Sequence, residues 1–150
     1  MPGTVIIGSD HGGYALKKVL VEALRKDGFA VDDSGPDCRD SCDYPVFGQI
    51  VVKKVLGELS RGAMGILVCG TGLGMSITAN RFAGIRAAVC TNEYMAHMAR
   101  AHNDANILCL GERVVGPGLA LSIVKVFLAT PFEGERHQRR LDLIESMDRR

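Results

Sequence analysis

The chain has 150 residues, about the length of one ordinary domain, of which 47% are hydrophobic and 23% are charged. This composition is close to the average of folded proteins and excludes an intrinsically disordered chain. The net charge of +1 gives no whole-molecule field that would hold nucleic acid or an anionic membrane. No apolar run approaches the roughly 18 residues of a membrane span. The first residues lack the pattern of a secretion signal, so we expect a cytoplasmic protein.

Short apolar runs alternate along the chain with longer segments of helical period. The short runs are mostly too short for helices and rich in β-branched residues, which is typical of buried strands. In chain order, we expect strands over residues 4–8, 29–31, 64–69, 86–90 and 105–110. We expect helices over about residues 16–26 and 45–59, and a short helix that follows the glycine-rich loop and ends at about residue 82. A further helix should run from residue 91 or 92 to about 102, another should begin at residue 117, and a last one should cover about residues 141–147.

Glycine and proline mark the ends of several of these helices. Gly28 ends the first helix, whereas Pro45 and Pro117 suit the first turns of later ones. Lys17 is expected on the solvent face of the first helix, with the other charged residues of that segment. Because the strands are apolar rather than alternating, and a helix follows each, they predict a parallel sheet covered on both faces. We therefore predict one three-layer α/β/α domain over residues 1–150, Rossmann-like or flavodoxin-like, with a C-terminal helical extension.

The five cysteines suggest different roles. Their number is odd and no export signal precedes them, so a disulfide framework is not expected. Cys90 and Cys109 lie inside apolar runs and are interpreted as small buried hydrophobic residues. Cys38 and Cys42 flank a polar loop without nearby histidine, which is a poor zinc signature. Cys69 differs, because it ends a strand directly before a glycine-rich loop.

Polar and glycine-rich residues crowd the carboxyl ends of the predicted strands. Ligands bind at this edge of an open parallel sheet. The first strand is followed by residues 9–13, the third by residues 69–74 and the fifth by residues 111–113. If the first and third strands are neighbours, their loops face each other across one crevice.

The glycine-rich loop after the third strand has two interpretations. Its glycines either allow close approach to an anion at a helix start or simply make a tight turn. A dinucleotide fingerprint needs a later third glycine and an acidic residue further on, and a Walker loop needs Gly-Lys-Ser/Thr, so both are disfavoured. A thiol phosphatase would need an arginine where Gly74 stands. Cys69 is either another buried cysteine or a base or nucleophile whose thiolate the loop N–H groups favour.

Other titratable residues also have structural interpretations. Asp10 is either a helix N-cap or, with His11, an acid–base pair in the crevice. His102 stands in the last turn of its helix, where the helix dipole favours a cation, and Asn103 would cap that helix.

Two arginines near the C-terminus share one helix face. Arg136 and Arg140 are four residues apart, so they either converge on a phosphate or form a solvated basic face. Aromatic residues make up only 5% of the chain, which argues against a stacking surface for nucleic acid.

Taken together, the motifs resemble those of type B ribose-5-phosphate isomerases, in the same order and from residue 4 to about 148. The wider family also holds allose-6-phosphate and galactose-6-phosphate isomerases. The motifs are Ser9-Asp10-His11-Gly12-Gly13, Asp43-Tyr44-Pro45, Cys69-Gly70-Thr71-Gly72-Leu73-Gly74, Asn80-Arg81-Phe82-Ala83-Gly84-Ile85-Arg86, His102-Asn103-Asp104-Ala105-Asn106 and Arg136-His137-Gln138-Arg139-Arg140.

The resemblance implies the interconversion of ribose 5-phosphate and ribulose 5-phosphate, a step of the pentose phosphate pathway. The reaction would pass through an enediolate without a metal or an organic cofactor. The resemblance also implies a homodimer, or a tetramer, with active sites between subunits.

The resemblance also implies a role for each site residue. One branch of the family uses a glutamate directly after the glycine loop as its base; Met75 stands there, so the chain resembles the cysteine branch. The implied catalytic residues are Cys69 as the base, His102 as the ring-opening acid, Asp10 for the hydroxyl protons and Thr71 for the anion hole. The implied substrate contacts are His11, Gly70, Gly72, Leu73, Gly74, Asn103, Arg113, Arg136 and Arg140. A hexose 6-phosphate isomerase, or a sugar-phosphate sensor without chemistry, stays open as an alternative.

Overall fold

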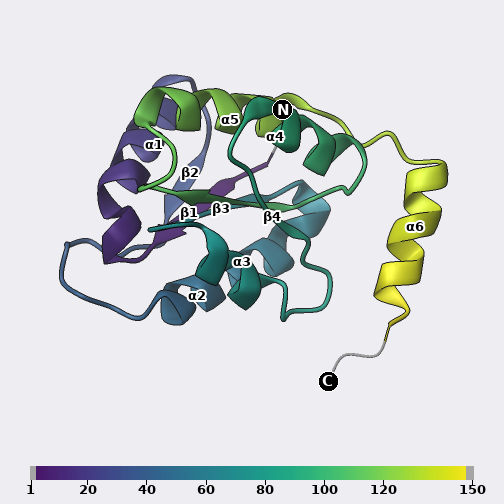
Figure 1. Ribbon diagram of the computed structural model, residues 1–150, viewed down its shortest axis with the longest axis horizontal. Coiled ribbons are helices and arrows are strands. Elements are labelled where there is room, and N and C mark those ends of the chain that lie inside the picture. The colour runs from purple at the N-terminus through teal and green to yellow at the C-terminus, as the bar shows by residue number, and fades with distance from the viewer. Residues whose placement is uncertain (1–2, 148–150) are drawn as a thin grey trace.

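The structure is a computed structural model that describes residues 3–147 (Figure 1). The strands are β1 (Val5–Ser9), β2 (Val31–Asp33), β3 (Met64–Cys69), β4 (Ala87–Val89) and β5 (Ile107–Gly111). The α-helices are α1 (Tyr14–Lys26), α2 (Tyr44–Glu58), α3 (Leu73–Ala79), α4 (Glu93–Ala101), α5 (Pro117–Ala129) and α6 (Arg136–Glu145). Short 3-10 turns η1 (His11–Gly13) and η2 (Leu59–Arg61) adjoin α1 and α2.

The five strands form one parallel sheet in the order β2-β1-β3-β5-β4. The predicted α/β fold class is confirmed, and the last two strands are exchanged relative to the flavodoxin order. β1 pairs with β3 along its whole length, from Val5 opposite Met64 to Ser9 opposite Val68. The carboxyl ends of these two strands therefore lie side by side, as the crevice between their loops requires.

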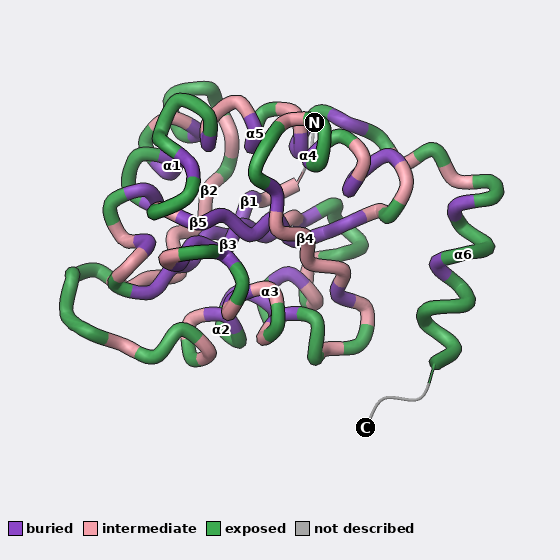
Figure 2. The backbone as a smooth tube through the Cα atoms, viewed as in Figure 1, coloured by how far each residue is buried: buried purple, intermediate pink, exposed green. Residues whose placement is uncertain are grey.

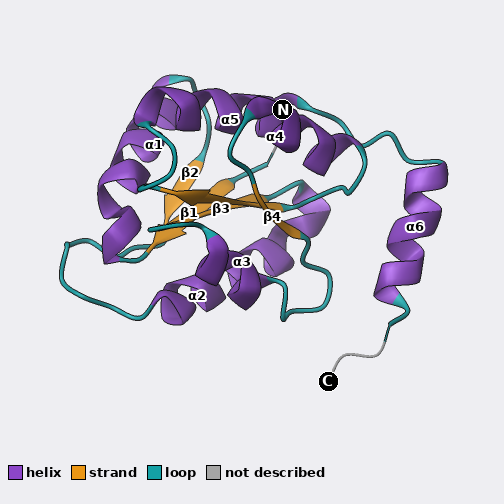
Figure 3. Cartoon of the chain, viewed as in Figure 1, coloured by secondary structure: helices purple, strands orange, loops and turns teal. Residues whose placement is uncertain are grey.

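Helices cover both faces of the sheet and enclose two apolar clusters (Figure 3). On one face, α1, α4 and α5 pack over a cluster that includes Leu20 and Phe127. On the other face, α2 and α3 pack over a cluster that includes Val51 and Met75. None of the helices between residues 3 and 147 is long and apolar enough to cross a membrane.

α6 stands apart from the three layers as the predicted C-terminal extension (Figure 2). Its apolar side chains are only partly covered: Leu141 is buried, whereas Leu143 is 58% exposed and Ile144 is 49% exposed. A stripe of this kind is ordinarily buried against another surface.

The largest correction to the sequence prediction concerns Lys17, which was expected to face solvent. Its side chain is 1% exposed, and its Nζ donates to Asp33 Oδ1 and to the carbonyl of Pro36, both at 2.7 Å. The periodicity of α1 could not reveal these acceptors, because they lie at the end of β2 and in the loop that follows it. The expected strand over residues 29–31 is also shifted, to Val31–Asp33.

Candidate active site

The loops that follow β1 and β3 meet at the carboxyl edge of the sheet. Asp10 follows β1 and donates its backbone N–H to the carbonyl of Val68 at 3.2 Å. Its carboxylate Oδ1 accepts the N–H of Gly13 at 3.0 Å, so Asp10 caps η1. The two loops therefore lie against each other where the crevice is predicted, and Asp10 stands between them with its carboxylate held by the cap.

Cys69 ends β3 with its thiol against the glycine loop. The sulfur accepts the N–H of Gly72 at 3.1 Å, and Cys69 as a whole is only 5% exposed. Gly72 has φ of +82°, a backbone conformation that favours glycine, and this turn aims its N–H at the sulfur. The residue also belongs to the apolar cluster under α2 and α3. Cys69 is therefore buried, and one loop N–H donates to its sulfur.

Arg113 brings a positive charge to the same loop. Its backbone N–H donates to the carbonyl of Gly70 at 3.1 Å, and its Nη1 lies 3.3 Å from where a Cβ on Gly70 would stand. Thr71 is exposed beside it, with its hydroxyl accepting the N–H of Leu73 at 3.2 Å. The loop therefore presents a guanidinium, a hydroxyl and backbone donors, which together suit an anionic oxygen or a phosphate.

Two residues at this crevice were given no role in the sequence analysis. The N–H of Cys42 donates to Nδ1 of His11 at 3.2 Å, and the Cys42 sulfur lies 4.0 Å from that nitrogen. The ring of Tyr44 packs over Gly74, with its Cζ 2.7 Å from where a Cβ on Gly74 would stand. Thus the polar loop before α2 folds back over the crevice. Tyr44 lay within a family motif, whereas no spacing signal connected Cys42 with His11.

The other predicted site residues lie at the opposite edge of the sheet. α4 starts after the carboxyl end of β4 and runs back, so His102 and Asn103 lie beside the start of that strand. There, Nε of Arg86 donates to the carbonyl of Asn103 at 3.0 Å. The nine residues of α4 span about 13 Å. One chain therefore does not bring Cys69 and His102 together.

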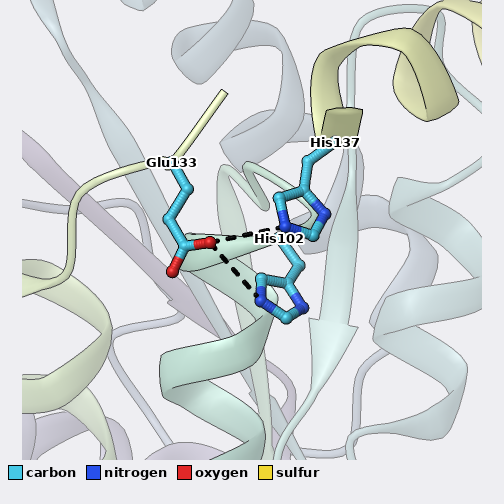
Figure 4. A group of neighbouring side chains, drawn as sticks. All are labelled: His102, Glu133 and His137. Carbon is cyan, nitrogen blue, oxygen red and sulfur yellow. Dashed lines mark ion pairs between the residues drawn. The ribbon is translucent and has the colours of Figure 1, made fainter. Parts of the chain in front are cut away.

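His102 lies in a cluster with Glu133 and His137 (Figure 4). Oε2 of Glu133 lies 3.6 Å from Nε2 of His102 and 3.4 Å from Nε2 of His137. The two imidazole rings stack with centroids 4.0 Å apart. Burial lowers the pKa of His137, as do the neighbouring His102 and Arg136, while Glu133 acts in the opposite direction.

Arg136 and Arg140 are exposed on α6, next to this cluster. Neither forms an ion pair with an acidic group in the described part of the chain. Two guanidinium groups on one helix face, without a carboxylate partner there, are available to an anionic ligand.

Comparisons with known proteins agree with the motifs. The family model described as Ribose/Galactose Isomerase matches residues 5–144. Ribose-5-phosphate isomerase B of Escherichia coli is 44% identical over 146 residues, covering 97% of each chain. The structure of ribose-5-phosphate isomerase B from Clostridium thermocellum is 55% identical, with a TM-score of 0.90 over 95% of each chain. That from Mycoplasma genitalium with bound ribulose-5-phosphate is 44% identical, with a TM-score of 0.91 over 97% of this chain and 95% of that one. The chain therefore belongs to the ribose/galactose isomerase family.

Proposed function

We propose that the chain is an isomerase that interconverts D-ribose 5-phosphate and D-ribulose 5-phosphate through an enediolate. The observation that carries this proposal is the hydrogen bond from Gly72 to the Cys69 sulfur, at the crevice between the β1 and β3 loops. The names of the relatives, and the ribulose-5-phosphate bound to the Mycoplasma genitalium protein, support the choice of substrate. We further propose that the whole chain acts as one domain, in the cytoplasm, in the pentose phosphate pathway.

In the proposed mechanism, Cys69 moves a proton between two carbons. Its thiolate removes the proton from C2 of the open-chain aldose, and the electron pair of that C–H bond forms the C1–C2 double bond. Negative charge then develops on the former carbonyl oxygen, where Thr71 and the loop N–H groups stabilise it. Loss of one such donor typically costs on the order of 100–1,000-fold in rate. The thiol returns the proton to C1 and yields the ketose.

The remaining residues prepare and hold the substrate. Asp10 carries the proton between the two hydroxyl oxygens, and His102 protonates the ring oxygen to open the furanose. His11 and Arg113 contact the sugar at the crevice. Arg136 and Arg140 grip the phosphate, which keeps a short substrate in register with the thiol.

The site as proposed is shared between two copies of the chain. Cys69 and His102 lie at opposite edges of one sheet, so the acid must come from a partner. Arg136, Arg140 and Asn103 lie at the same edge as His102 and would come from that partner too. The partly exposed apolar stripe of α6 supplies a surface for the contact. We therefore propose a homodimer in which each site combines the crevice of one subunit with the His102 edge of the other.

Mixed dimers test this sharing directly. Cys69→Ala and His102→Ala are each inactive alone, but in a mixed dimer one site carries both defects and the other carries none. Equal mixing with random pairing restores about one quarter of wild-type activity, because half of the dimers are mixed and half of their sites are intact. No recovery in a mixture shown to contain mixed dimers would place both residues in one site of one chain.

The base is tested with Cys69→Ala, and Cys90→Ala serves as the matched control. We expect Cys69→Ala to lose nearly all turnover of ribose 5-phosphate while it still binds the substrate, measured by ligand-induced thermal stabilisation. Cys90→Ala should keep its turnover, since Cys90 belongs to the apolar cluster on the other face of the sheet from Cys69. Activity should also survive a chelator. Substantial turnover by Cys69→Ala would show that another group is the base.

A hexose 6-phosphate is the second candidate substrate, because the family description also names galactose. Rates measured side by side on ribose 5-phosphate, allose 6-phosphate and galactose 6-phosphate decide between them. Exchange of the C2 hydrogen with solvent separates either isomerase from a sensor, which would bind the sugar phosphate without exchange.

A further inference from the structure

We propose that His102, Glu133 and His137 form a site for a divalent transition-metal ion, for which Zn²⁺ is the best fit. Each residue offers one ligand atom, and the three atoms lie within 4.8 Å of one another. Two imidazole nitrogens and one carboxylate oxygen are a donor set that Zn²⁺ accepts, with water in the fourth position.

The two distances from Glu133 suit a tetrahedral ion. Bonds of about 2.0–2.1 Å to ligands at tetrahedral angles place those ligands about 3.3–3.4 Å apart. The distances from Oε2 of Glu133 to the two Nε2 atoms are 3.4 and 3.6 Å. Figure 4 shows the ion-pair contacts of both nitrogens with this one oxygen, from the end of α4 and from α6.

The second observation is a buried nitrogen without a hydrogen-bond partner. The side chain of His137 is 5% exposed, and its Nε2 has no hydrogen-bond partner among residues 3–147. A buried polar atom is normally satisfied, because leaving it unpaired costs its full desolvation energy. A metal ion between this nitrogen and Glu133 would satisfy it.

The backbone around the cluster holds two of the ligands in place. The N–H of Glu133 donates to the carbonyl of Ala101 at 3.0 Å, which fixes this segment beside His102. The N–H of His137 donates to the carbonyl of Gly134 at 3.0 Å and closes the turn that starts α6. The His102 side chain, at 36% exposure, is the freer of the two histidines. The two rings are nearly parallel, at 15°, so one of them must rotate before both lone pairs can point at one ion. His102 is the ring that rotates, because its side chain is the more exposed.

Occupation of this site would inhibit the isomerase, a consequence that rests on the proposed function. Metal bound to Nε2 of His102 removes the acid that opens the sugar ring. Arg136 and Arg140 stand nearby and oppose a cation, so the site would fill only as free Zn²⁺ rises. The ion acts here as an inhibitor and takes no part in the isomerisation.

The primary test is a Zn²⁺ titration of the metal-stripped full-length protein against a chromophoric chelator, without substrate. The thiols of exposed Cys38 and half-buried Cys42 are replaced by serine in every variant, so that they do not bind the metal. We expect one Zn²⁺ per chain in the parent. Glu133→Gln should weaken binding more than 100-fold, since losing even a group that only supports a metal ligand costs about 10–100-fold. Glu135→Gln, the same change on the same turn outside the cluster, should bind as the parent does.

His137→Gln is a second variant that tests the buried ligand, and it should also lose the site. Because His137 is buried, the folding of this variant is checked by circular dichroism. If the variant fails to fold, the Glu133→Gln variant still decides the test, since Glu133 is exposed. Equal affinity of the parent and Glu133→Gln would overturn the proposal.

The inhibition is measured separately. Zn²⁺ should reduce turnover in the parent and in Glu135→Gln, reversibly with chelator, and should affect Glu133→Gln far less. Metal binding without any isomerase activity would refute the proposed function and leave the metal site standing. Isomerase activity without tight Zn²⁺ binding would refute the metal site and leave the proposed function standing.

Discussion

Gly111→Ala perturbs the glycine loop without touching any proposed catalytic side chain. Gly111 ends β5 opposite Cys69. A Cβ at this position would lie 2.6 Å from the carbonyl carbon of Thr71 and 2.7 Å from its Cα and oxygen. Ordinary contact begins at 3.4 Å, so the loop backbone must move by about 0.8 Å. The loop that moves carries Gly72, whose N–H bonds the Cys69 sulfur.

The displacement has a cost in rate and a cost in stability. A misplacement of about 1 Å at a reacting group typically costs about 100-fold in rate, so we expect kcat to fall by about that factor. Overpacking of this kind costs about 1–3 kcal/mol of unfolding free energy. At about 2–4 °C per kcal/mol for a protein of this size, the melting temperature should fall by several degrees.

The assay pairs steady-state kinetics on ribose 5-phosphate with thermal melting. Gly118→Ala, in the first turn of α5, is the control, because a Cβ there meets no atom within 4 Å. It should leave kcat unchanged and stabilise the helix by up to about 1 kcal/mol. If Gly111→Ala folds and keeps kcat within about twofold of the parent, the position of the Thr71 loop does not govern the reaction.

Three further predictions concern other parts of the chain. Lys17→Ala should cost about 1–3 kcal/mol in urea unfolding, because it removes a buried cation from Asp33, which is 26% exposed, whereas exposed Lys18→Ala should cost little; equal costs would contradict this. Arg136→Ala should raise KM about 10–100-fold with a smaller effect on kcat, as expected for loss of a charge-assisted hydrogen bond to the phosphate; an unchanged KM would remove this arginine from the site. Burial raises the pKa of Cys90 to about 11, so iodoacetamide at pH 8 should label exposed Cys38 and leave Cys90 unmodified, which mass spectrometry resolves; equal labelling would refute the burial argument.

The sequence was sufficient for the fold class and for the polar and glycine-rich loops at the carboxyl edge of the sheet. Apolar runs that alternate with helical periods specify a parallel sheet covered on both faces, because only such a sheet buries both faces of its strands. The glycine loop after β3 and the polar residues after β1 then mark the edge where a ligand binds.

The sequence also contained a signal that was not used for His102. A helix that follows a parallel strand returns to the amino edge of the sheet, so a residue in its last turn cannot stand with residues that follow the strands. Applied to His102, this rule separates it from Cys69 within one chain.

Other features of the site were decided only by the tertiary structure. The sequence period of an element shows which of its faces is apolar, but it does not show which distant residue covers a given side chain. The burial of Lys17 depends on Asp33 and Pro36, which a different segment supplies. In the same way, Glu133 reaches His102 only because its backbone is tied to the end of α4. Contacts of this kind join residues far apart in the chain, and no local pattern records them.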